Sequence, residues 1–102
     1  MKEGEIQSYC LEVLRTYGIF HMRLNSGVVK TRGAWVHLCP AGTADILTFP
    51  RERPPFWLEI KQLKGEQHAK QEEFQARVTA LGHGYAVINS QMAMDAIVHK
   101  LR

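Results

Sequence analysis

Cysteine is scarce in this 102-residue chain, and its two cysteines do not form a metal-type pair. Cys10 falls within an apolar helical pattern and Cys39 at the end of an expected strand, so both are expected to be free thiols. No two of the five histidines lie four residues apart, and no Cys-x-x-Cys accompanies them, which argues against zinc. The chain also lacks a Gly-x-Ser-x-Gly segment, so a serine hydrolase is not supported.

Long apolar runs are absent as well. No apolar stretch approaches about 18 residues and no basic-then-apolar leader opens the sequence, so a membrane role finds no support. Together with the free thiols, this predicts a cytoplasmic, reducing setting. The net charge of +3 permits a polyanionic partner without requiring one.

What is present indicates one ordinary folded domain over residues 1–102. Hydrophobic residues make up 45% and charged residues 23% of the chain, which excludes disordered and collagen-like classes. Apolar periodicity predicts an α/β fold with a mixed β-sheet flanked by helices, in the order α-β-β-β-α-β-α with three or more strands between the first two helices. The expected helices span residues 2–17, about 67–81 and 90–102, and the expected strands span residues 19–24, 28–30, 34–39, 45–49, 56–62 and 85–88.

Two short apolar strands carry charges that a strand inside a small domain should not carry. Alternation in the second strand places Glu59 and Lys61 on the same face, roughly 6 to 7 Å apart. If Asp45 on the first strand lies beside them, two carboxylates and an ammonium converge on one small volume. By themselves these residues are better explained as charges on an edge strand, because a lone acidic residue followed by Glu-x-Lys occurs often by chance.

Such a group has the composition of a magnesium site for phosphate chemistry. Asp45, Glu59 and the backbone carbonyl of Ile60 would supply an oxygen-only shell for Mg²⁺, with Mn²⁺ as a substitute. Mg²⁺ lowers the pKa of the water it binds and so supplies a nucleophile for a phosphodiester. Lys61 would stabilise the charge that develops on the phosphate, or act as a base.

The two long helices each contribute one polar residue near the same place. Gln71 heads the apolar stripe of the second helix and is expected to point toward the sheet. Glu5 borders the apolar stripe of the first helix, although a simple favourable charge in the first helical turn is the more ordinary interpretation.

A basic segment follows the first expected strand. Arg23, Lys30 and Arg32 decorate it, and the turn Asn25-Ser26-Gly27 offers backbone N–H groups that would hold a phosphate. The commoner alternative is that these are solvated turn charges. We predict a nucleic-acid contact at Arg23, Asn25, Ser26, Gly27, Lys30 and Arg32.

Taken together, these motifs resemble those of the PD-(D/E)XK nucleases, and within them the small VRR-NUC domains. The resemblance is carried by Gly42-Thr43-Ala44-Asp45, Glu59-Ile60-Lys61, Gln71, Gly82, Glu5-Ile6-Gln7 and Asn25-Ser26-Gly27. It implies a restriction-endonuclease-like core and a metal-dependent phosphodiesterase with Asp45, Glu59 and Lys61 catalytic. It further implies that Gln71 supports the catalytic group and that Glu5 supports the metal.

One residue departs from the family pattern: Ala44 stands where a proline usually precedes the aspartate. Proline sets backbone shape and supplies no ligand, so we expect only a modest effect on geometry.

A stand-alone domain of this kind is similar to the Holliday-junction resolvases of archaea and phages, which serve DNA repair and recombination. The resemblance implies branched DNA as partner, a homodimer, no small-molecule cofactor, and compatibility with a phage-encoded enzyme acting in a host cell. Symmetric cutting of a four-way junction independently requires two sites related by a two-fold axis. A flap or duplex nuclease and a non-catalytic nucleic-acid-binding module remain alternatives.

Overall fold

The chain folds around a four-stranded mixed sheet, seen in a computed structural model that describes residues 1–24 and 27–102. The strand order in the sheet is β1-β4-β5-β6. β1 pairs antiparallel with β4, β4 pairs antiparallel with β5, and β5 pairs parallel with β6. The elements are α1 (Glu3–Thr16), β1 (Phe20–Arg23), β2 (Val28–Thr31), β3 (Ala34–His37), β4 (Ile46–Phe49), β5 (Phe56–Ile60), α2 (Ala69–Ala80), β6 (Gly84–Ile88), α3 (Gln91–Ile97) and a short 3₁₀ helix (Val98–Lys100).

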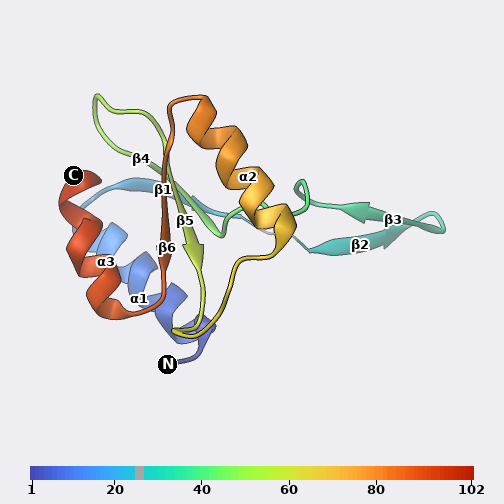
Figure 1. Ribbon diagram of the computed structural model, residues 1–102, viewed down its shortest axis with the longest axis horizontal. Helices are drawn as coiled ribbons and strands as arrows, with labels where there is room; N and C mark the ends of the chain where they lie inside the picture. The colour runs from blue at the N-terminus through green and yellow to red at the C-terminus, as the bar shows by residue number, and fades with distance from the viewer. Residues whose placement is uncertain (25–26) are drawn as a thin grey trace.

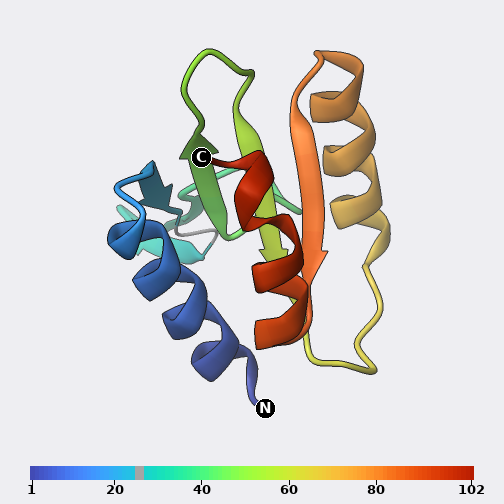
Figure 2. The same ribbon diagram turned by 90° about the vertical axis from the view of Figure 1, so that its left-hand side faces the viewer.

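Helices cover both faces of this sheet, as the sequence predicts. α1 and α3 lie together on one face and α2 lies on the other (Figures 1 and 2). The core is on the α1/α3 side, where Ile6, Cys10 and Leu14 of α1 meet Leu58 and other strand residues. Each fully buried aliphatic side chain of this kind contributes about 1.5–3 kcal/mol. The α/β class with a mixed, helix-flanked sheet is therefore confirmed.

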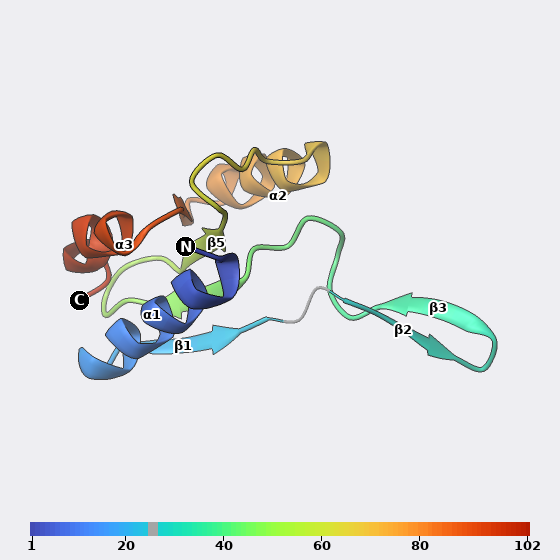
Figure 3. The ribbon, with the colours of Figure 1, turned by 90° about the horizontal axis from the view of Figure 1, so that it is seen from below.

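The segment after β1 departs from the sheet. β2 and β3 pair antiparallel with each other and form a separate two-stranded hairpin. The hairpin extends away from the body of the molecule (Figures 1 and 3), and every residue in its two strands is exposed. Its turn uses Arg32 and Gly33, both at positive φ, which is the backbone of a tight hairpin turn.

Two details differ from the sequence-based expectation. β6 reads as an interior strand, but it is an edge strand with β5 as its one neighbour in the sheet. Its apolar composition instead reflects contacts with α2 and α3. The second helix begins at Ala69, with His68 as its N-cap, slightly later than expected. Within the described part of the chain, no helix is both long enough and apolar enough to cross a membrane.

Candidate active site

Asp45 is fixed against the neighbouring strand just before β4 begins. Its backbone N–H donates to the Leu58 carbonyl at 3.1 Å, and its Oδ2 accepts a hydrogen bond from the Ile60 N–H at 2.7 Å. Asp45 is therefore held at β5 by the backbone groups on either side of Glu59: the Leu58 carbonyl binds its backbone N–H, and the Ile60 N–H binds its side chain. The sequence predicted this neighbourhood from strand proximity, and the structure brings the two acidic residues together.

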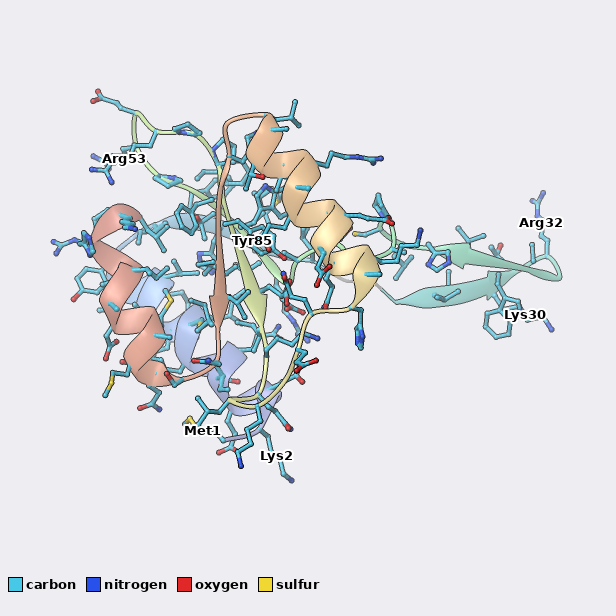
Figure 4. All side chains as sticks on the ribbon, viewed as in Figure 1. Met1, Lys2, Lys30, Arg32, Arg53 and Tyr85 are labelled. Atoms are coloured by element: carbon cyan, nitrogen blue, oxygen red, sulfur yellow. The ribbon has the colours of Figure 1, made fainter. Side chains whose placement is uncertain are left out.

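The Glu59 side chain lies in the interior, with only 1% of its surface exposed. Its Oε1 accepts hydrogen bonds from Gln67 Nε2 at 2.9 Å and from the Tyr85 hydroxyl. Its Oε2 is buried and has no hydrogen-bond partner among the described residues. Leaving a buried carboxylate oxygen without a partner is costly, so such an atom requires an explanation. Figure 4 labels Tyr85 between β6 and α2.

Electrostatics link the two carboxylates directly. Burial raises the pKa of Asp45 above its ordinary value, the Ile60 N–H opposes that shift, and the charges of Glu59 and Glu3 raise the pKa further. The nearby Lys61 ammonium lowers the same pKa. A buried Asp45 whose ionisation is disfavoured by the neighbouring Glu59 charge forms a site where a divalent cation would be stabilising.

Lys61 follows directly after β5 and is 9% exposed. Its backbone N–H donates to the Ile88 carbonyl at 3.0 Å, which continues the pairing with β6. Within the described residues Lys61 forms no ion pair. A buried ammonium that acts on Asp45 without being bound to it is available for another anion.

The turn before Asp45 depends on one glycine. Gly42 has φ +84°, and a Cβ there would lie 2.1 Å from the backbone oxygen of Lys70. Thr43 Oγ1 donates to the Pro40 carbonyl at 2.6 Å and closes the turn. Glycine thus allows this turn to approach the start of α2, and the approach sets where Asp45 enters the sheet.

Aromatic side chains close the site on the α2 side. Phe74 of α2 meets Trp57 edge-on, with ring centroids 4.9 Å apart, and it also lies near Tyr85. Burial and the Glu59 carboxylate both raise the pKa of the Tyr85 hydroxyl, so this group stays protonated and donates to Glu59. Gln67 Nε2 also donates to Gln75 Oε1 at 2.9 Å, which anchors it to α2.

Gln71 has a different contact from the one expected. Its Oε1 accepts a hydrogen bond from the His68 N–H at 2.8 Å. The amide therefore satisfies a free N–H at the start of α2, as a capping-box glutamine does. The contact to Glu59 comes from Gln67 instead.

Glu5 also serves the end of its helix. It is exposed, and its Oε1 accepts from the Lys2 N–H at 3.2 Å. It lines a surface cavity together with Ser8, Glu12 and Gln91. The acidic residue of α1 whose charge acts on Asp45 is Glu3.

Three residues near the site were missed from the sequence, namely Glu3, Gln67 and Tyr85. A signal existed for Glu3, because it lies three residues before Ile6 and seven before Cys10 and so heads the buried stripe. Tyr85 lies two residues before Val87, the register partner of Glu59, but this parallel register is not visible in the sequence.

The described residues predicted to contact nucleic acid lie in two places, at the end of β1 and on the β2–β3 hairpin. Arg23 ends β1 and pairs with Ile46, next to Asp45. Lys30 and Arg32 belong to the distant hairpin, at whose base the Gly27 carbonyl accepts from the Leu38 N–H. The predictions for Asn25 and Ser26 lie outside the described residues.

Two of the candidate carboxylates, and not three, are placed where they could bind a hard divalent cation. Among the described residues no group of three His, Cys, Asp or Glu side chains converges as a ready-made metal site. Asp45 and Glu59 remain, together with the backbone carbonyl of Ile60, and Glu59 Oε2 is the buried atom that a cation would satisfy. Two carboxylates with water and phosphate oxygens are a usual set for Mg²⁺.

Comparison with known proteins supports the same architecture. No protein-family model and no curated protein sequence matches the chain. A solved structure of a VRR-NUC domain superposes with a TM-score of 0.73 at 19% sequence identity, covering 98% of this chain and 97% of that one. The chain has the VRR-NUC fold. The restriction-endonuclease-like core implied by the sequence motifs is thereby confirmed for nearly the whole chain.

Proposed function

We propose that the chain is a metal-dependent DNA endonuclease that hydrolyses phosphodiester bonds. The observation that carries this proposal is the buried Oε2 of Glu59, which has no hydrogen-bond partner among the described residues and lies beside Asp45 and the buried Lys61. The similar solved structure is described as a VRR-NUC domain, which agrees with nuclease chemistry on this fold.

Each side chain has a distinct task under this proposal. Tyr85 and Gln67 hold Glu59 Oε1, so that Oε2 is directed to the cation. Asp45, oriented by the Ile60 N–H, is the second carboxylate ligand. Together these carboxylates would hold Mg²⁺ or Mn²⁺, and that ion would supply Lewis acidity and lower the pKa of a water molecule.

Lys61 interacts with the substrate rather than with the metal. Its ammonium is held close to Asp45 without an ion pair, so it is free to contact a phosphate oxygen and stabilise the charge that develops during hydrolysis. Arg23, beside Asp45 at the end of β1, would contact the neighbouring phosphate.

The finer proposal is that the preferred substrate is a four-way junction, cut by a homodimer. One chain carries one such site, and paired symmetric cuts require two sites related by a two-fold axis. Flap, end or duplex cutting uses the same ligands, because the selection of a DNA shape depends on surfaces outside the metal site.

A cleavage panel tests the proposal. Four-way junction, flap, duplex and single-stranded DNA are each incubated with Mg²⁺, Mn²⁺ or EDTA, beside Asp45→Ala and Lys61→Ala. Cleavage is expected with either metal and lost in EDTA and in both variants. Cleavage that persists in EDTA or in either variant would refute the site, and binding without cutting in any metal would favour a non-catalytic module.

A further inference from the structure

The β2–β3 hairpin has two chemically different faces. Directly paired residues share a face, and the register pairs Val28 with His37, Val29 with Val36, Lys30 with Trp35, and Thr31 with Ala34. Lys30, Trp35 and His37 therefore lie on one face, which we call the aromatic face. The opposite face carries Val29, Val36, Thr31 and Ala34, none of them charged or aromatic.

The aromatic face is open to solvent. Trp35 is 69% exposed, and the Lys30 ammonium lies over its ring, 5.9 Å from the ring centroid. Lys30 and Arg32 lie near the far end of the hairpin, where their side chains point to opposite sides (Figure 4). The face of this indole is therefore accessible to a planar ligand, and the neighbouring ammonium is accessible to an anion.

The charge of the whole segment indicates what that ligand is. Between Glu12 and Asp45 the sequence contains no acidic residue, whereas Arg23, Lys30 and Arg32 all fall in this interval. A region free of carboxylates that includes a protruding basic arm favours a polyanion over a protein of mixed charge. An indole next to a cation is the combination that stacks on a nucleobase while holding its phosphate.

We propose that the aromatic face of the hairpin binds unpaired nucleotides, with Trp35 stacking on a base and Lys30 contacting the adjacent phosphate. In duplex DNA the faces of the bases are already stacked, so Trp35 reaches a base where strands separate, as at a flap or a branch point. The hairpin would thereby select DNA with unpaired nucleotides. This inference rests on the proposed function for its DNA partner.

Binding in EDTA separates the inference from catalysis. Fluorescence anisotropy compares a single strand, a flap and a fully paired duplex with the wild-type chain, Trp35→Ala, Trp35→Phe and Val36→Ala. Val36→Ala is the matched control, because it truncates the neighbouring residue on the opposite face. Trp35→Ala is expected to weaken binding of the single strand and flap by about 10-fold and of the duplex by less than about 2-fold. Trp35→Phe is expected to retain most of the affinity.

A spectroscopic readout accompanies the binding curves. Stacking should quench the emission of wild-type protein on addition of single-stranded DNA, and the quenching should disappear in Trp35→Phe, whose one remaining tryptophan is Trp57. Circular dichroism and thermal melting check that Trp35→Ala folds, since the core contains no hairpin residue.

Four outcomes would overturn the inference. Trp35→Ala could keep its affinity for unpaired DNA, lose as much affinity for duplex as for unpaired DNA, or lose no more affinity than Val36→Ala does. Alternatively, sedimentation could show that Trp35→Ala converts a dimer to a monomer. The last would mean that a second copy covers this face. Cleavage in Mg²⁺ is scored separately. If no DNA is cut but Trp35→Ala still weakens binding of unpaired DNA selectively, the proposed nuclease function fails and the inference stands. If DNA is cut but Trp35→Ala does not change DNA binding, the inference fails and the proposed nuclease function stands.

Discussion

The two oxygens of the Glu59 carboxylate have unequal environments. Oε1 accepts two hydrogen bonds, while Oε2 is buried without one. Burying an incompletely paired carboxylate costs stability, and a structure that keeps such a group uses it for binding or chemistry. A bound cation at Oε2 would offset that cost, so this atom is the strongest single indication of a metal site.

Removing the Tyr85 hydroxyl tests whether Glu59 must be held for the metal to bind. In Tyr85→Phe, Oε1 loses one of its donors and the carboxylate becomes less fixed. The affinity for Mn²⁺, measured by titration calorimetry, should fall by about 10-fold or more.

Tyr9→Phe is the matched control for that experiment. It also removes a hydroxyl that donates to a carboxylate, that of Asp95 at 2.6 Å, but this hydrogen bond between α1 and α3 is exposed to solvent. Its metal affinity should equal that of the wild type. Equal affinities in all three proteins would show that Tyr85 does not support a metal ligand.

The raised pKa of Asp45 predicts how stability depends on pH. Because burial favours the neutral acid in the folded protein, the charged form destabilises the fold above that pKa, and the penalty disappears as pH falls through it. In EDTA, Asp45→Asn should melt at a higher temperature than the wild type at neutral pH, and the gap should narrow toward about pH 4. Asp95→Asn, which neutralises an exposed carboxylate, should show no such gap. A constant or inverted gap for Asp45→Asn would contradict the assigned burial.

The sequence predicts which candidate residues lie together where strand alternation and proximity place them, and does not predict this where long-range packing decides. Asp45, Glu59 and Lys61 could be predicted because charges on apolar strands are conspicuous. Tyr85 could not, because its approach to Glu59 depends on a parallel register across a crossover. Gln71 heads the apolar stripe of α2, and for that reason the sequence places it at the site. The first turn of a helix also has free N–H groups, and the Gln71 amide oxygen accepts from one of them, the His68 N–H.

The approach of the Gly42 turn to α2 positions Asp45, the first of the proposed metal ligands. Gly42→Ala places a methyl group 2.1 Å from the Lys70 oxygen at a positive φ, so it should lower the free energy of unfolding by about 2 kcal/mol or more. Urea denaturation measures this change.

Gly82→Ala provides the comparison for the Gly42 variant. Gly82 has φ +86°, but a Cβ there would meet nothing within 4 Å, so the substitution should cost about 1 kcal/mol from backbone strain alone. If the two variants lose the same stability, the close contact between the turn and α2 is not required for the fold.

The elements differ in how far the sequence determines them. α1 and the β4–β5 pair follow from periodicity and proximity and appear close to their predicted positions. The hairpin strands were expected too, but whether they would join the main sheet depends on β1 pairing with β4, which sequence does not specify. The apolar composition of β6 is typical of an interior strand, but contacts with helices on both faces give an edge strand the same composition.

For the whole molecule, the junction proposal requires a dimer. The chain should sediment as a dimer at micromolar concentration, either alone or on four-way junction DNA, because two symmetric cuts need two sites. A monomer under both conditions would exclude paired cutting of a junction by this protein. It would leave the metal site and cleavage of flaps or duplexes intact.

The most direct test of the central claim compares the wild type with Glu59→Gln in DNA cleavage. Glutamine keeps the shape of the side chain and removes the charge that a cation requires. With Mg²⁺ the wild type should cut at least one of the junction, flap and duplex substrates and lose the activity in EDTA. Glu59→Gln should bind the same DNA but cut it about 100-fold more slowly or not at all. A folded Glu59→Gln protein that cleaves at the wild-type rate, or wild-type cleavage that continues in EDTA, would contradict the account.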